Sequence, residues 1–213
     1  MDTLWGNRGW GSCLVEAQLD WYGMPYRTEM VNPWKDPEGR ERLRRVNPLV
    51  QLPTMVLADG SIMTESVAIT FMLADRARAA GIADRDILVP RPEEAVRERY
   101  LRWQVFLVAN IYPMFTIVDD VTRWVSGEEA QKSLHEHASA YRERMWAQVE
   151  ANAGAGPWFL GDRFSALDIY IAVMTRWTPR RAYFAERCPR LTSIALAADR
   201  EPRLAATWKR NFD

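Results

Sequence analysis

Two short groups of residues have the chemistry to hold a small peptide by its backbone and by its charged end. Pro53 stands at the start of a predicted strand, where a proline is tolerated because it removes a ladder hydrogen bond only at the entry or edge of a sheet. A cis bond between Leu52 and Pro53 would leave the backbone of Leu52 free to pair with an extended peptide, as a strand adds to a sheet edge. The alternative is a proline whose only role is strand entry.

The second group, Thr64-Glu65-Ser66, lies where a predicted hairpin meets the next helix. Exposed backbone N–H groups at the start of a helix attract a carboxylate, and the negative charge of Glu65 can pair with an ammonium group. Together the three residues could hold both charged groups of a free amino-acid end. The alternative is a capped helix with Thr64 as its N-cap and an acidic first turn.

The elements around these groups are predicted to alternate between strand and helix. Asp59-Gly60 between two apolar runs favours a tight hairpin turn, and Gly81 ends the helix that begins at Glu65. The remaining patterns predict a strand over residues 3–6, a helix over 12–22 that begins at Ser12 and is stopped by Gly23, and a second strand over 25–31. The two strands and the helix would form a right-handed parallel crossover. Residues 32–45 are expected to be irregular or to form a short helical segment.

The rest of the chain is predicted to be helical. Residues 82–92 are polar and end in Pro90-Arg91-Pro92, which favours an interdomain linker. A helix is expected from Glu93 to about Trp124 with a bend at Pro113, followed by a break at Ser126-Gly127 and a charged helix to about residue 152. Ser165 and Asp168 are spaced as an N-capping box for a further helix.

The residues from Asn47 to Gly60, with Glu65-Ser66 just beyond, resemble the thioredoxin-like half of cytosolic glutathione S-transferases of bacterial type. Residues 158–168, Trp-Phe-Leu-Gly-Asp-Arg-Phe-Ser-Ala-Leu-Asp, resemble the segment leading into that family's buried central helix. The resemblance implies an α/β thioredoxin-like N-terminal domain over residues 1–81, a linker over 82–92 and an all-α C-terminal domain over 93–213.

The resemblance also implies roles for individual residues. In that family the proline is cis, the residue before it pairs with the cysteinyl part of glutathione, and the acidic-Ser pair holds the γ-glutamyl end. These roles fall to Pro53, Leu52, Glu65 and Ser66. The expected ligand is therefore glutathione, acting as a co-substrate.

The first loop departs from the family pattern. A Tyr, Ser or Cys there usually contacts the glutathione sulfur, but Gly9 occupies the usual serine position and Gly11 the cysteine position. Ser12 is our leading candidate for activating the thiol, since it can offer a hydroxyl and a backbone N–H at the positive end of a helix, and Asn7 is the alternative donor. Ser12 could equally serve as a helix cap.

An apolar second substrate would need an apolar wall between the two domains. Trp10, Trp34 and Trp103 lie in segments expected to border that cleft, and aromatic side chains suit such a pocket. A glutathione transferase that conjugates the thiolate to a small apolar electrophile is the expected function. The alternatives are an isomerase, lyase or peroxidase that uses glutathione on the same fold, or a glutathione-binding protein without catalytic activity.

Composition narrows the range of partners. The 28 basic and 28 acidic residues balance with no long block of one sign, which argues against a nucleic-acid or membrane surface. No leader pattern is seen at the N-terminus, so we expect a cytoplasmic protein, and the family suggests a homodimer. Cys13 and Cys188 are far apart, and His135 and His137 face different sides of a helix, so no metal site is expected.

Overall fold

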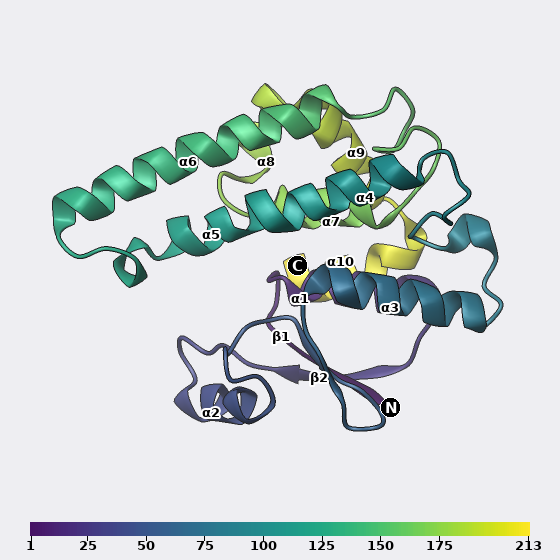
Figure 1. Ribbon diagram of the computed structural model, residues 1–213, viewed down its shortest axis with the longest axis horizontal. Coiled ribbons are helices and arrows are strands. Elements are labelled where there is room, and N and C mark those ends of the chain that lie inside the picture. The colour runs from purple at the N-terminus through teal and green to yellow at the C-terminus, as the bar shows by residue number, and fades with distance from the viewer.

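The computed structural model describes residues 1–213 and has two layers of unequal size (Figure 1). The lower layer is a four-stranded sheet, and helices α1 (Ser12–Tyr22) and α3 (Ser66–Ala79) lie between it and the larger helical layer. This is a thioredoxin-like α/β domain followed by an all-α domain, as the sequence predicted.

The sheet has the strand order β2-β1-β3-β4. Strand β1 (Asp2–Gly6) pairs in parallel with β2 (Tyr26–Met30) and antiparallel with β3 (Thr54–Val56), which pairs antiparallel with β4 (Ile62–Met63). The predicted βαβ unit and hairpin are therefore both present. The stretch predicted to be irregular or short helical contains α2 (Pro37–Val46), which begins after Asp36, whose side chain accepts the Gly39 N–H at 2.8 Å.

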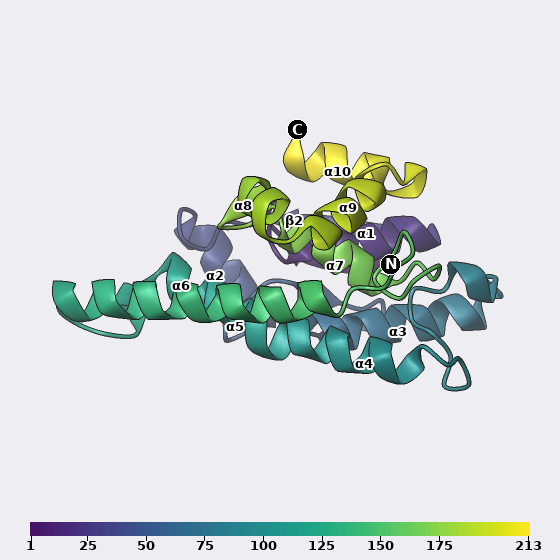
Figure 2. The same cartoon turned by 90° about the horizontal axis from the view of Figure 1, so that it is seen from above.

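The helical domain contains the remaining elements, which Figure 2 shows from above. They are α4 (Arg97–Phe106), a π-helical turn (Leu107–Ile111), α5 (Tyr112–Asp119), a 3₁₀ turn (Val121–Arg123), α6 (Glu128–Ala151), α7 (Ala166–Met174), α8 (Arg180–Arg187), α9 (Pro189–Asp199), a second 3₁₀ turn (Pro202–Leu204) and α10 (Ala205–Phe212).

The predicted bend near Pro113 takes the form of the π turn. Proline has no N–H and cannot continue the regular hydrogen-bond ladder. The Tyr112 N–H donates to the Leu107 carbonyl, five residues back, so the turn widens just before the proline. The continuous helical run Arg97–Asp119 is also the one helix long and apolar enough to cross a membrane by length and composition. Its inner face, with Trp103, Leu107 and Ile111, packs into the protein core.

One hydrophobic core joins the two domains. It runs from α1 and α3 into α4 and α7, and every residue of α7 is buried. The linker takes part, because Ile87, Leu88 and Val89 are each 1% exposed. The Leu88 N–H donates to the Tyr22 hydroxyl oxygen at 2.8 Å, and the Leu88 carbonyl accepts the Ala166 N–H at 2.9 Å. The domains are therefore packed as one body, with residues 87–90 of the linker buried between them.

Candidate functional site

The loop between β1 and α1 is closed by Ser12. Its hydroxyl accepts the Asn7 N–H at 3.0 Å and donates to the Asn7 carbonyl at 3.1 Å, and Ser12 is 3% exposed. A hydroxyl has one hydrogen, and this one is already used inside the loop. Ser12 was our leading sequence candidate for thiol activation, but its hydroxyl is used in hydrogen bonds that hold the loop together. The neighbouring Cys13 points into the core, where burial raises the pKa of its thiol.

Asn7, the alternative donor, has a different arrangement. Its side-chain oxygen accepts the Arg8 N–H at 3.0 Å, while its amide nitrogen makes no hydrogen bond within the chain. The backbone N–H groups of Gly11 and Ser12 at the start of α1 are also without a partner. These donors lie at the N-terminal end of α1, where the helix dipole favours negative charge.

Two distant residues fix the loop, and the sequence did not single out either. The Gly9 N–H donates to Asn211 of α10 at 2.9 Å, and the Gly9 carbonyl accepts the indole N–H of Trp177 at 2.7 Å. Asn211 in turn donates to Glu16 of α1 at 2.8 Å. Gly9 itself has a φ of +70°, which favours glycine and explains why no serine stands there.

The Leu52–Pro53 peptide bond is cis. The Leu52 N–H and carbonyl make no hydrogen bond within the chain, although strand β3 begins two residues later. The turn before it is fixed from inside, because Thr54, 0% exposed, donates to the Gln51 carbonyl at 2.8 Å and Asn47 donates to Thr54 at 2.9 Å. The structure thus presents one residue of free backbone at the end of the sheet.

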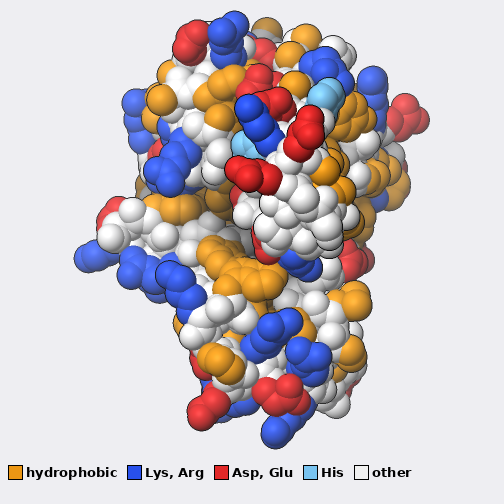
Figure 3. Space-filling view, turned by 90° about the vertical axis from the view of Figure 1, so that its left-hand side faces the viewer, with side chains coloured by type: hydrophobic (Ala, Val, Ile, Leu, Met, Phe, Trp, Pro, Cys, Tyr) orange, Lys and Arg blue, Asp and Glu red, His pale blue; other side chains and the backbone are white.

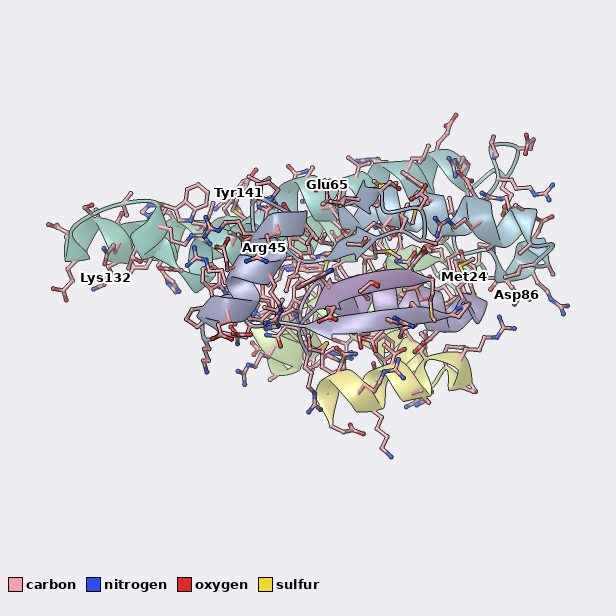
Figure 4. The ribbon with its side chains drawn as sticks, turned by 90° about the horizontal axis from the view of Figure 1, so that it is seen from below. Met24, Arg45, Glu65, Asp86, Lys132 and Tyr141 are labelled. Carbon is pink, nitrogen blue, oxygen red and sulfur yellow. The ribbon has the colours of Figure 1, made fainter.

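Glu65 and Ser66 lie at the start of α3, which follows β4. Met63 of β4 pairs with Met55 of β3, so the start of α3 and the Leu52 backbone lie at the same end of this strand pair. Glu65 is exposed and has a φ of +62°, an uncommon conformation for a residue other than glycine. No side chain caps the helix, so Thr64 does not act as the N-cap, and the N–H groups of the first turn remain open to an anion. Figure 4 shows Glu65 on the outer side of the molecule, with Arg45 of α2 on the same flank.

The three predicted cleft tryptophans have three different environments. Trp10 is half-buried in the first loop. Trp34, in the β2–α2 loop, is 59% exposed, and the guanidinium of Arg123 lies 5.1 Å from its ring centroid, which links the two domains. Trp103 is 3% exposed and packs edge-on against Phe106 and Phe159, so its prediction as a cleft residue was wrong.

The aromatic wall beside the first loop is made of other residues. Trp177 packs edge-on against Tyr112 at 5.3 Å and against Phe115 at 5.1 Å, both from α5. Tyr112 reaches the loop: a β-carbon on Gly11 would overlap its hydroxyl oxygen and lie 3.3 Å from the Leu52 carbonyl oxygen. In Figure 3, hydrophobic side chains gather at the waist between the upper helical part and the lower α/β part.

Metal-ligating side chains are not clustered in the structure, which has no group of three or more His, Cys, Asp and Glu residues placed to hold an ion. The site consists of free backbone at Leu52, an open helix end beside Glu65 and an aromatic wall. Such a set suits an extended peptide with a charged amino-acid end and an apolar neighbour.

Known structures of similar shape contain this kind of ligand. A glutathione transferase homologue from Sulfitobacter, solved with bound glutathione, superposes with a TM-score of 0.83 at 21% identity, covering 98% of this chain and 97% of that one. A sphingomonad glutathione S-transferase complexed with glutathione has a TM-score of 0.72 at 24% identity, with 97% of each chain covered. At these identities the likeness establishes the shared fold.

Sequence relatives and family models carry the assignment further. The uncharacterized GST-like protein YncG of Escherichia coli K12 is 34% identical over 213 residues, covering 99% of this chain and 98% of the relative. Glutathione S-transferase GST-4.5 of Xanthomonas campestris is 26% identical over 78% of each chain. The family models for the N-terminal and C-terminal domains of glutathione S-transferase match residues 15–76 and 128–206. The chain therefore belongs to the glutathione S-transferase family.

Proposed function

We propose that the protein binds glutathione and transfers it, as the thiolate, to a small apolar electrophile. The observation that carries the proposal is the free backbone of Leu52 beside the open, uncapped end of α3 at Glu65-Ser66. The Leu52 N–H and carbonyl would pair with the cysteinyl part of the ligand. Glu65 would hold the ammonium group of the γ-glutamyl end, and the first-turn N–H groups with Ser66 would hold its carboxylate.

The conjugation needs a thiolate and a place for the electrophile. A free thiol of pKa about 8.5 is mostly protonated at neutral pH, so donors in the site must favour its ionised form. The half-buried rings of Trp10 and Trp177 would face the second substrate beside the first loop. The thiol proton leaves to solvent, and the sulfur attacks an electrophilic carbon of the second substrate. We place this activity in the cytoplasm.

Substitutions at the γ-glutamyl site test the binding step. Glu65→Gln keeps the size and backbone conformation of the residue but removes the charge, and Ser66→Ala removes one hydroxyl. Each variant should bind glutathione about 10- to 100-fold more weakly, with Glu65→Gln the more damaging, because a hydrogen bond to a charged group contributes about 1.5–3 kcal/mol. Calorimetric titration with glutathione measures the effect.

The matched control is Glu136→Gln, which removes an exposed carboxylate from the middle of α6. It should leave the affinity for glutathione unchanged. Binding by Glu65→Gln and Ser66→Ala that equals binding by the unmodified protein would show that glutathione is held elsewhere or not at all.

A non-catalytic glutathione-binding protein is the second candidate. It is favoured by the first loop, where Gly9 and Gly11 carry no side chain and the Ser12 hydroxyl is occupied by Asn7. An isomerase, lyase or peroxidase would share the same glutathione site. A panel of electrophiles, peroxides and isomerisable substrates, each assayed with glutathione, separates these activities. Retention on immobilised glutathione without turnover of any of them would favour the second candidate.

A further inference from the structure

Gly11 is required for space and not for its backbone conformation. Its φ of −58° and ψ of −21° are helical values that any residue adopts. A β-carbon at this position would overlap the hydroxyl oxygen of Tyr112 and come within 3.1 Å of the Tyr112 Cζ. A side chain of α5, about a hundred residues away in the sequence, therefore occupies the volume that a side chain at position 11 would take.

The Tyr112 ring is held in this position by its surroundings. It packs edge-on against Trp177, with an interplanar angle of 84°, and Trp177 donates to the Gly9 carbonyl in the same loop. The Tyr112 N–H donates to the Leu107 carbonyl and closes the π turn immediately before Tyr112. This turn sets the direction in which the ring leaves the helix. Helix and loop are thereby joined at the point where the phenol enters the site.

The Tyr112 hydroxyl has a proton to donate and makes no hydrogen bond within the chain to receive it. Burial, together with the charges of Glu65 and Asp119, raises its pKa above the usual value for tyrosine, so the phenol stays protonated at neutral pH. A β-carbon on Gly11 would meet both this hydroxyl oxygen and, at 3.3 Å, the carbonyl oxygen of Leu52, the residue expected to pair with the cysteinyl backbone, so both groups border the same point of the loop.

We propose that Tyr112 is the catalytic residue that contacts the glutathione sulfur, supplied by the helical domain in place of a side chain from the first loop. The proposal rests on the glutathione site proposed above. The phenol keeps its own proton and donates a hydrogen bond to the thiolate, while the thiol proton passes to solvent. Gly11 and Tyr112 then form a complementary pair. Position 11 of the loop has no side chain, and the Tyr112 hydroxyl of α5 occupies that space as a hydrogen-bond donor.

Tyr112→Phe tests the proposal in the full-length protein. Phenylalanine keeps the ring and its packing against Trp177 but removes the hydroxyl. The bound thiol's pKa, followed by ultraviolet thiolate absorbance in the glutathione complex, should rise by about one to two pH units, with about 10- to 100-fold less thiolate at a given pH below it. Binding of glutathione at a pH where the thiol is protonated should change less than threefold.

Tyr100→Phe is the matched control. Tyr100 is fully buried in α4, and its hydroxyl also has no hydrogen-bond partner, but it lies in the core away from the first loop. This variant should leave the thiol titration unchanged. A rescue variant, Gly11→Ser combined with Tyr112→Phe, returns a hydroxyl to the loop in the space that the phenol vacated, and it should restore part of the thiolate signal.

The contact itself can be tested without glutathione. Gly11→Ala should lower the melting temperature of the parent protein, because the added methyl group meets the Tyr112 hydroxyl, and lower it less in the Tyr112→Phe background, where that oxygen is absent. An unmoved thiol titration in a Tyr112→Phe protein that still binds glutathione would overturn the proposal. Failure of the unmodified protein to bind glutathione would instead overturn the proposed function.

Discussion

Ser12 illustrates how a residue type suited to chemistry can be used for structure. Its hydroxyl gives and receives one hydrogen bond with the main chain of Asn7 in a site that is 3% exposed. Each of these bonds contributes roughly 0.5–1.5 kcal/mol, and a buried group left without a partner adds to the loss. Ser12→Ala should therefore lower the free energy of unfolding by about 1–3 kcal/mol, measured by urea denaturation.

The same variant separates this role from sulfur activation. If Ser12 only closes the loop, the thiol titration of the glutathione complex should be the same in Ser12→Ala as in the unmodified protein. A raised thiol pKa in Ser12→Ala with little loss of stability would return the catalytic role to Ser12. Asn7→Ala is a useful companion, because the amide nitrogen of Asn7 is free and its removal leaves the two Ser12 bonds in place.

Residues of the site differ in how far the sequence could reveal them. Leu52, Pro53, Glu65 and Ser66 lie in two short local patterns, and the resemblance to the family predicted their roles together. Tyr112 and Asn211 reach the first loop from α5 and α10, and Trp177 reaches it from the turn between α7 and α8. Asn211 meets Gly9 across about two hundred residues. Such contacts depend on how the helices pack, which residue spacing within one segment does not specify.

At the level of elements, the capping box at the start of α7 is present and buried. The Asp168 carboxylate accepts the Ser165 N–H at 2.8 Å, the Ser165 hydroxyl at 3.1 Å and the Phe159 N–H at 2.7 Å. Burial nevertheless raises the pKa of Asp168 to about 7, against the three donors that favour the ionised form. One carboxyl group of the scaffold therefore titrates near neutral pH.

This titration predicts a pH dependence of stability. Between roughly pH 4, where an unfolded Asp ionises, and about pH 7, the folded protein holds a proton that the unfolded chain has lost. The contribution of Asp168 to stability is therefore complete below this window and falls as the pH rises through it. Asp168→Asn should flatten the decline in melting temperature from about pH 5 to pH 8, and its cost in stability, from the loss of one acceptor, should be largest at the acid end of this range.

The control for this prediction is Asp162→Asn, which changes an exposed carboxylate shortly before the same helix. It should keep the pH dependence of the unmodified protein. A decline as steep in Asp168→Asn as in the unmodified protein would mean that other groups produce it.

The helices and strands were largely predictable because the residues that begin and end them act locally in the sequence. Gly23 has a φ of +64° directly after α1, and Gly60 occupies the hairpin turn with a φ of +86°, so both glycines mark the turns that their types suggest. The stretch from residue 32 to 45 was less clear, since α2 carries mostly charged residues on a short helix. The π turn before Tyr112 depends on a hydrogen bond between residues five positions apart. A single proline in the sequence indicates a bend in the helix, but not this hydrogen-bond pattern.

At the scale of the whole molecule, the last helix ties the two domains to the site. Helix α10 reaches the first loop through Asn211 and reaches α1 through Arg210, which donates to Glu16 at 2.6 Å. The loop that should surround the sulfur is thereby held by the C-terminal end of the chain. Composition and local pattern indicated a helical C-terminal half, but not that its final turns complete the N-terminal site.

The remaining expectation is a homodimer. We propose that the face carrying α3 and α4 forms the interface between its two chains. Helix α3 leaves Val67, Phe71 and Met72 only partly covered, and Val105 of α4 is 49% exposed. Both helices lie on the same side of the molecule in Figure 2, and Glu65, at the start of α3, lies toward that side in Figure 4. A stable dimer buries roughly 800 Å² on each partner, with apolar side chains at its centre.

Light scattering at micromolar concentration should therefore give twice the mass of one chain. Val105→Glu places a charge on the proposed interface and should shift the protein toward the mass of a single chain, because an unpaired buried charge is strongly unfavourable. Leu196→Glu is the matched control, since Leu196 is 44% exposed on α9, a helix that lies away from α3 and α4 in Figure 2. A single-chain mass for the unmodified protein would refute the dimer. A dimer that survives Val105→Glu but dissociates in Leu196→Glu would instead move the interface to α9, away from the open end of α3 that the glutathione site uses.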